Sequence, residues 1–198
     1  MKLAIISDIH GSIIALERVL TQLEPWQPDH YLLLGDLLNH GPRNPLPEGY
    51  NPAAVADRLN EFAPQIIAVR GNCDSEVDQM LLRFPITAPY NQLLIDERRW
   101  FVSHGHLYRP DEVQLPVGSL FLSGHTHVPV LEWQGERVLM NPGSICFPRG
   151  ELPASYGSYE DGVLRVNACE DGQELLRLVL KTESTNARPD KRCQALIP

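Results

Sequence analysis

The sequence contains few cysteines and no long apolar run, and both absences narrow the class of protein that it encodes. Its 198 residues include four cysteines, none in a Cys-x-x-Cys pair. This scatter argues against a thiolate zinc site and against a disulfide framework, so a reducing compartment is expected. The apolar stretch near the N-terminus covers only residues 3–6, too short for a signal peptide or a membrane span. We therefore predict a cytoplasmic protein with no membrane partner.

Positive charge is also scarce. Lys and Arg number 17 against 25 Asp and Glu, a net charge of −8, so no overall positive field attracts a polyanion and we expect no stable nucleic-acid partner. With 14 Gly and 17 Pro the chain is not of low complexity, and 43% hydrophobic residues suffice for one globular core. We predict one domain over residues 1–181 and, because the last stretch is polar, a flexible tail over 182–198.

Short apolar runs alternate with helical patterns in the first half of the chain. Strand-like runs at 3–6, 31–34 and 66–69 alternate with helical spacing over 13–23 and 52–62, an order that implies parallel strands. Ser12 is the expected cap of the first helix. From about residue 85 the chain is rich in strand-like segments, with hairpin turns expected at 134–136 and 160–162. We predict an α/β fold in which two sheets pack face to face with helices outside.

Five polar clusters follow directly after strand-like runs. They are Asp8-Ile9-His10, Gly35-Asp36, Gly71-Asn72-Cys73-Asp74, His104-Gly105-His106 and Gly124-His125-Thr126-His127. Ligands bind at the carboxyl ends of strands in α/β sheets, so five strands can deliver these groups to one place. In Asp-x-His and His-x-His, both side chains would lie on the same side of an extended segment and grip one ion. Each cluster alone fits a cap, a turn or a surface histidine, but together they predict a metal centre.

In this order the five clusters resemble the motifs of the calcineurin-like metallophosphoesterases. The compact length, Asn-His-Gly-Pro-Arg-Asn at 39–44 and Asn-Pro-Gly-Ser at 141–144 resemble more specifically the small bacterial phosphodiesterases of the YfcE type. The resemblance covers roughly residues 1–180. It implies a four-layer α/β/β/α sandwich of two mixed β-sheets flanked by helices.

The resemblance also implies two divalent metal ions in neighbouring sites. It assigns the first ion to Asp8, His10 and His127, the second to Asn72, His104 and His125, and the bridge between them to Asp36. Imidazole, carboxylate and amide ligands without thiolate independently suit Mn²⁺, our first choice, or Zn²⁺, Fe or Ni²⁺.

The reaction that the resemblance implies is hydrolysis of small phosphodiesters by direct attack of a metal-bridging hydroxide. Two divalent ions outweigh the charge of Asp8, Asp36 and a hydroxide, so the site favours a phosphate anion. The alternatives are a phosphomonoesterase of the same fold and a protein-binding scaffold like the retromer subunit with this fold. In that scaffold key ligands are replaced, whereas all are present here. Relatives self-associate, so a homo-oligomer is also a prediction.

One position departs from the family pattern. Many relatives carry a histidine after the metal-binding asparagine, where it protonates the leaving oxygen with help from a nearby acid. This sequence has Cys73 in that place, followed by Asp74, and we predict that both belong to the catalytic residues together with Asp36 and Asn72. A thiol with a pKa of about 8.5 is a poorer proton donor than an imidazolium, so we expect a preference for good leaving groups.

Three further residues are candidates for contact with the substrate. His40 and Arg43 lie in the loop that begins at Asp36, and arginine suits bidentate recognition of phosphate. The alternative is a solvated arginine in a loop stiffened by prolines. His106 is expected beside the site because of its spacing from His104.

Overall fold

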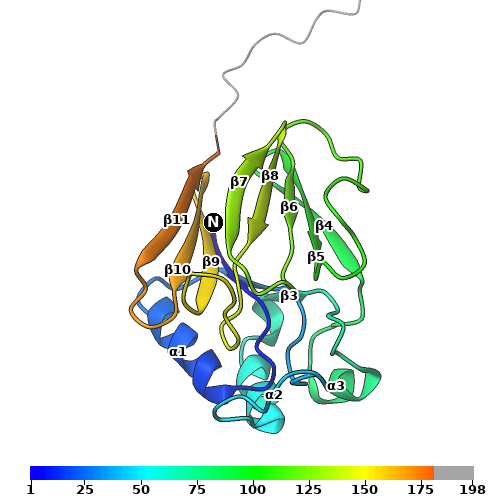
Figure 1. The fold of residues 1–198 in the computed structure, drawn as a ribbon, viewed down its shortest axis with the longest axis vertical. Helices are drawn as coiled ribbons and strands as arrows, with labels where there is room; N and C mark the ends of the chain where they lie inside the picture. The colour runs from blue at the N-terminus through cyan, green and yellow to red at the C-terminus, as the bar shows by residue number, and fades with distance from the viewer. Residues whose placement is uncertain (181–198) are drawn as a thin grey trace, which may run out of the picture.

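Two mixed β-sheets packed face to face form the frame of the molecule (Figure 1). The computed structural model describes residues 1–180. The prediction of two packed mixed sheets is confirmed. The predicted flexible tail over 182–198 lies outside the described residues.

The first sheet has six strands and carries the first three predicted strands at one side. Its members are β1 (Lys2–Ile6), β2 (His30–Leu33), β3 (Ile66–Ala68), β9 (Ser155–Glu160), β10 (Val163–Ala168) and β11 (Glu174–Val179). Their order is β11-β10-β9-β1-β2-β3, with β1, β2 and β3 parallel and the others antiparallel. The central place of β1 agrees with its sequence, because Ala4, Ile5 and Ile6 are fully buried and both faces of the strand are covered.

The second sheet has five strands. They are β4 (Tyr90–Ile95), β5 (Arg98–Ser103), β6 (Leu120–Leu122), β7 (Val130–Gln134) and β8 (Arg137–Asn141), in the order β4-β5-β6-β8-β7. Strands β5, β6 and β8 are parallel to one another. The two predicted hairpin turns are present, because Gly135 joins β7 to β8 and Asp161 with Gly162 joins β9 to β10, all three with positive φ.

Alternating side chains divide the apolar residues between two cores. Ile5 and Leu32 of the first sheet pack with Trp100 of the second between the sheets. Ala4 and Ile6 point the other way, into a core shared with the helices. The division follows from the two-residue period of a strand, which sends neighbouring side chains to opposite faces.

Helices α1 (Ile13–Leu23) and α2 (Pro52–Asn60) cover the outer face of the six-stranded sheet (Figure 1). As predicted, α1 begins after Ser12, whose hydroxyl accepts a hydrogen bond from the Ala15 N–H. The predicted second helix ends earlier than expected and gives way to a 3-10 turn over Ala63–Gln65. Within residues 1–180, no helix has the length and apolar character that a bilayer crossing requires.

The outer face of the second sheet carries no helix in the described part of the chain, which differs from the predicted sandwich with helices on both outer sides. Loop 104–118 covers part of that face, and the Tyr108 ring packs edge-on against Phe101. Prolines at 110 and 116 and glycine at 118 keep this loop from forming a helix. The third helix, α3 (Glu76–Leu81), packs beside α2.

Candidate metal centre

The five polar clusters converge at one end of the two sheets. They follow the carboxyl ends of β1, β2 and β3 in the first sheet and of β5 and β6 in the second. Ligand atoms lie within 4.8 Å of one another in three groups, which are Asp8 with His10 and His127, Asp8 with Asp36 and His104, and His10 with Asp36 and Cys73. The prediction that separate strand ends deliver these residues to one place is confirmed.

The backbone that delivers these side chains is left-handed. The φ angles are 56° at Asp8, 50° at His10, 55° at Asp36, 65° at His125 and 61° at His127. The expectation of an extended segment is therefore wrong for the pairs Asp8–His10 and His125–His127. Each left-handed non-glycine residue costs about 1–2 kcal/mol, and such strain is typical of functional sites.

Backbone carbonyls orient three of the imidazoles. Nδ1 of His10 lies 2.9 Å from the Asn39 oxygen, Nδ1 of His104 lies 2.7 Å from the Leu34 oxygen, and Nδ1 of His127 lies 2.8 Å from the Phe147 oxygen. A carbonyl oxygen can only accept, so each Nδ1 donates and the Nε2 of each neutral ring keeps its lone pair. The lone pairs point into the cluster, which is how metal-binding histidines are held.

Asp8 places an unpaired oxygen among these nitrogens. The residue is fully buried, and within residues 1–180 its Oδ1 accepts no hydrogen bond. Nε2 of His127 lies 3.2 Å from that oxygen, Nε2 of His10 lies 3.6 Å away, and Nε2 of His104 lies 4.0 Å away. A buried carboxylate oxygen is costly without a partner. These residues therefore fit a bound cation.

Two hydrogen bonds fix the orientation of the Asp8 carboxylate. Its Oδ2 accepts from the Ser7 hydroxyl at 2.6 Å and from the His125 N–H at 3.1 Å. The loop can approach this closely because residue 124 is glycine, since a Cβ on Gly124 would lie 1.9 Å from the Ser7 hydroxyl oxygen. The strand ends of the two sheets thus meet at Asp8.

Asp36 lies between the two predicted ligand sets. Its Oδ2 is 3.4 Å from Nε2 of His104 and 3.8 Å from Nε2 of His10. Oδ1 of Asn72 lies 3.1 Å from Nε2 of His104, and the ring centroids of His125 and His104 are 5.1 Å apart. The structure therefore brings the second predicted set together on the other side of Asp36.

The ionisable groups of the site shift one another's pKa. Burial alone would raise the pKa of Asp8, but the attraction of the adjacent His10 and His127 imidazoles brings it well below its usual range. Burial opposes the charge of His104, yet the hydrogen bond with Asp36 and the charge of Asp8 raise its pKa to about 9. The buried carboxylates are therefore stabilised by nearby positive charge. A bound metal ion would supply this charge and displace the protons of the histidines.

Asp74, predicted as a catalytic residue, contacts the backbone. Its carboxylate accepts hydrogen bonds from the N–H groups of Leu37 at 2.8 Å, Asp36 at 2.9 Å and Gly71 at 2.7 Å. The side chain is buried, and the bonds from Leu37 and Asp36 join the loop after β3 to the loop after β2, while the bond from Gly71 lies within the loop after β3. Both oxygens are used in this way, so Asp74 is a positioning residue for Asp36.

Cys73 faces the cluster. Burial, followed by the charge of Asp36, raises the pKa of its thiol to about 12. In the metal-free protein the thiol therefore stays protonated near neutral pH, which argues against a thiolate nucleophile. Its surroundings are tight, because a Cβ on Gly41 would lie 2.8 Å from the sulfur.

The remaining predicted residues surround the cluster. Nδ1 of His40 lies 3.3 Å from the Tyr50 hydroxyl, and Arg43 is exposed. The His106 ring lies beside the site as predicted, with its centroid 5.3 Å from that of His104. Burial lowers the pKa of His106. Contact of His40 or Arg43 with a substrate stays a prediction.

The end of β8 and the residues that follow it also support the centre. The Asn141 amide donates to the Gly124 carbonyl at 2.8 Å, and the Ser144 hydroxyl donates to the Asp8 carbonyl at 2.9 Å. The Ser144 hydroxyl also accepts from the Phe147 N–H at 2.9 Å. The signal for this role is topological, because β8 runs parallel to β6 and ends beside the same cluster.

Comparisons with known proteins agree with this geometry. A family model described as the calcineurin-like phosphoesterase superfamily domain matches residues 1–160. Phosphodiesterase YfcE of Escherichia coli K12 is 55% identical over 172 residues, which are 86% of this chain and 94% of YfcE. The solved structure of E. coli YfcE, described as a phosphoesterase, has a TM-score of 0.89 at 52% identity and covers 91% of this chain and 100% of its own.

A more distant likeness concerns the fold alone. The vacuolar protein sorting 29 structure from Cryptosporidium parvum has a TM-score of 0.63 at 16% identity. It covers 90% of this chain and 97% of its own. The same arrangement of sheets therefore occurs in a protein of very different sequence.

Proposed function

Because the chain belongs to the calcineurin-like phosphoesterase superfamily, we propose that it is a metal-dependent phosphodiesterase acting on small phosphodiesters at this centre. One observation carries the proposal. The Nε2 atoms of His10, His104 and His127 surround a buried Asp8 oxygen that accepts no hydrogen bond within residues 1–180. The similarity to the phosphodiesterase YfcE supports the choice of reaction.

Two sets of side chains would hold two divalent ions. We assign them as Asp8, His10 and His127 for one ion and Asn72, His104 and His125 for the other, with Asp36 between them. Oxygen and imidazole ligands favour Mn²⁺ and are also compatible with Zn²⁺, Fe or Ni²⁺. The ions would supply positive charge to the phosphoryl oxygens and lower the pKa of the attacking water.

The chain itself keeps these groups in place before the substrate arrives. Asp74 fixes the Asp36 loop through two backbone hydrogen bonds, and Ser7 fixes the Asp8 carboxylate. Preorganised groups do not have to reorient during the reaction, which is a major source of catalytic rate.

Proton transfer to the leaving group is the weak point of this site. Cys73 stands where relatives carry a histidine, and a thiol with a pKa of about 12 is a poor acid near neutral pH. We therefore propose that the substrates have leaving groups that depart with little protonation, such as aryl oxides. We also place Arg43, with His40 beside it, at the mouth of the site for contact with the substrate.

Hydrolysis of bis(p-nitrophenyl) phosphate by the Mn²⁺-loaded protein tests the function, with p-nitrophenyl phosphate as the matching monoester. Asp36→Asn should lower kcat/KM at least about a hundredfold, since it weakens the binding of both ions. Asp57→Asn, an exposed position on α2, is the matched control and should keep full activity.

Two other outcomes would favour the alternative functions. A protein that binds Mn²⁺ but leaves both esters intact would favour a protein-binding scaffold. A strong preference for the monoester would favour a phosphomonoesterase.

A further inference from the structure

The two loops that orient His10 and His127 each lead to an exposed arginine. Loop 39–44 gives the Asn39 carbonyl to His10 and continues to Arg43. Loop 147–149 gives the Phe147 carbonyl to His127 and continues to Arg149. Both histidines belong to the same proposed ligand set, so the two arginines flank one side of the centre.

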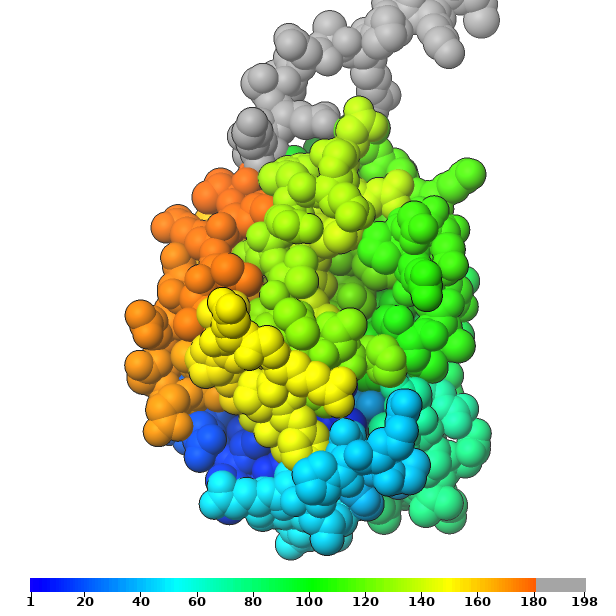
Figure 2. Space-filling model, viewed as in Figure 1, coloured from blue at the N-terminus to red at the C-terminus, as the bar shows by residue number. Residues whose placement is uncertain are grey.

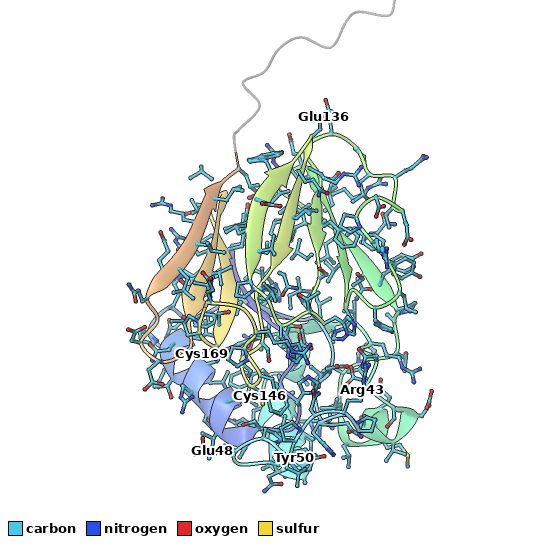
Figure 3. The ribbon with its side chains drawn as sticks, in the orientation of Figure 1. Arg43, Glu48, Tyr50, Glu136, Cys146 and Cys169 are labelled. Atoms are coloured by element: carbon cyan, nitrogen blue, oxygen red, sulfur yellow. The ribbon has the colours of Figure 1, made fainter. Side chains whose placement is uncertain are left out.

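Short contacts tie both loops to the site. The Arg149 N–H donates to the His127 carbonyl at 3.0 Å, and Gly41 lies against the Cys73 sulfur. Figure 2 shows both loops at the surface of the same end of the molecule, and Figure 3 places Arg43 at that end, opposite Glu136. The guanidinium groups therefore extend from backbone that is fixed beside the metal ligands.

Neither guanidinium is neutralised by the folded chain. Among residues 1–180, no acidic group lies within ion-pair distance of Arg43 or Arg149. Four other arginines do pair with glutamates, and they are Arg18, Arg58, Arg70 and Arg165. In a chain with a net charge of −8, two unpaired cations beside a phosphate site are available to a ligand.

The opposite side of the centre has a different character. The loop after His104 continues through His106 to Leu107, which is 57% exposed, and to Tyr108, which packs on Phe101. That side offers an apolar and aromatic surface. The two sides therefore differ, because Arg43 and Arg149 lie beside His10 and His127, whereas the exposed Arg109 beyond His104 is followed closely by the exposed Asp111 and Glu112.

We propose that the substrate is a phosphodiester that carries a second oxyanion, phosphate or carboxylate, on one ester arm, and that Arg43 and Arg149 bind this group. The inference rests on the proposed phosphodiesterase function. The scissile phosphate has a single negative charge, which the metal centre accommodates. The flat guanidinium fork matches a carboxylate or a phosphate with two parallel hydrogen bonds.

Two diesters with the same leaving group test the proposal. p-Nitrophenyl phenyl phosphate has a neutral second arm, and 4-carboxyphenyl p-nitrophenyl phosphate has an anionic one. The measured quantity is the ratio of kcat/KM for the anionic substrate to kcat/KM for the neutral one. Intrinsic reactivity cancels when this ratio is compared between wild type and variants.

Arg43→Ala and Arg149→Ala should each lower the ratio about fivefold. This effect is larger than the loss of a typical exposed ion pair and smaller than the loss of a well-formed hydrogen bond to a charged group. Arg109→Ala is the matched control, because Arg109 is an exposed arginine on the loop beyond His104. It should leave the ratio unchanged. A ratio that neither variant lowers, or that Arg109→Ala lowers equally, would overturn the proposal.

Calorimetric binding of benzylphosphonate and 4-carboxybenzylphosphonate gives a second measurement that involves no turnover. The extra carboxylate should strengthen binding to the Mn²⁺-loaded wild type, and most of that gain should disappear in Arg149→Ala. If neither diester is hydrolysed, the proposed function fails while calorimetry still decides on the arginines. If both diesters are hydrolysed with an unchanged ratio and the carboxylate adds no affinity, only the present inference fails.

Discussion

The Nε2 atoms of His10 and His127 face each other at 3.4 Å, although Nδ1 of each ring already donates to a backbone carbonyl. If both rings were neutral, the lone pairs of the two Nε2 atoms would repel each other across that gap. A proton or a cation must therefore lie between them. Burial works against a proton on His10, while the adjacent Asp8 carboxylate raises its pKa. This pair of nitrogens is therefore where protons and metal ions compete.

Loading with Mn²⁺ should stabilise the fold and release protons. The stabilisation is about 2.7 kcal/mol when free metal exceeds its Kd a hundredfold. Scanning calorimetry with Mn²⁺ and with a chelator measures the shift in Tm, and the dependence of the binding enthalpy on buffer reports the protons. Asp8→Asn should lose most of the shift, and Asp57→Asn should keep it. A wild-type Tm that does not change when Mn²⁺ is added would contradict the proposed centre.

The stability of the metal-free protein should fall in alkaline solution. Burial opposes the charge of His104, but Asp36 and Asp8 raise its pKa from 6.5 to about 9 in the folded state. Its protonation therefore favours folding fully below pH 6.5, and this contribution is lost as the pH rises through about 9. Urea unfolding in the presence of a chelator measures this loss.

Two substitutions isolate the contribution of His104. His104→Gln should remove this part of the pH dependence, whereas His30→Gln, at the exposed start of β2, should leave it unchanged. The same alkaline loss in both variants would show that His104 is not its source.

Replacing Asp74 should damage stability and activity together. Asp74→Ala leaves three buried N–H groups without their acceptor, a loss of about 3 kcal/mol in the free energy of unfolding. Asp78→Ala removes the capping box of α3, costs about 1 kcal/mol and should keep activity. Urea unfolding and diester hydrolysis on both variants make the comparison. Normal turnover by folded Asp74→Ala would show that the Asp36 loop needs no such support.

Cys73→His should improve the hydrolysis of diesters with alkyl leaving groups relative to aryl ones. A positioned general acid is typically worth about 10²–10⁴ in rate, and a partial gain of about tenfold in the alkyl-to-aryl ratio is expected because Gly41 crowds the position. Cys73→Ser, which adds no imidazole, should leave the ratio unchanged. Metal content and Tm must match wild type for the comparison. An unchanged ratio in a metal-replete Cys73→His protein would contradict the assigned role.

The order of strands and helices was predictable where apolar spacing is strong. The predicted helix over 13–23 coincides with Ile13–Leu23, because buried leucines and a valine recur at helical spacing after the Ser12 cap. Helix α3 has only six residues and none is buried, so Val77, Met80 and Leu81 repeat at helical spacing for little more than one turn. The capping box formed by Ser75 and Asp78 is its other local signal.

The identity of the clustered side chains was predictable, but the way they are held was not. The left-handed turns at Asp8 and His10 are fixed by hydrogen bonds from their N–H groups to the carbonyls of Gly35 and Asp36, at 3.1 and 2.9 Å. Those partners lie just after the neighbouring strand β2, far away in the sequence, so no local pattern reveals them. The same is true of Asp74, two of whose bonds reach residues more than 35 positions away.

The left-handed residues of the centre supply the proposed metal ligands but lower the stability of the fold. Glycine adopts their φ freely, so a glycine at any of the five positions would relieve about 1–2 kcal/mol of strain and would remove a proposed ligand. Selection for hydrolysis must maintain the side chains against that gain in stability. Where this selection is lifted, glycine substitutions here should leave the two-sheet frame intact and end metal binding.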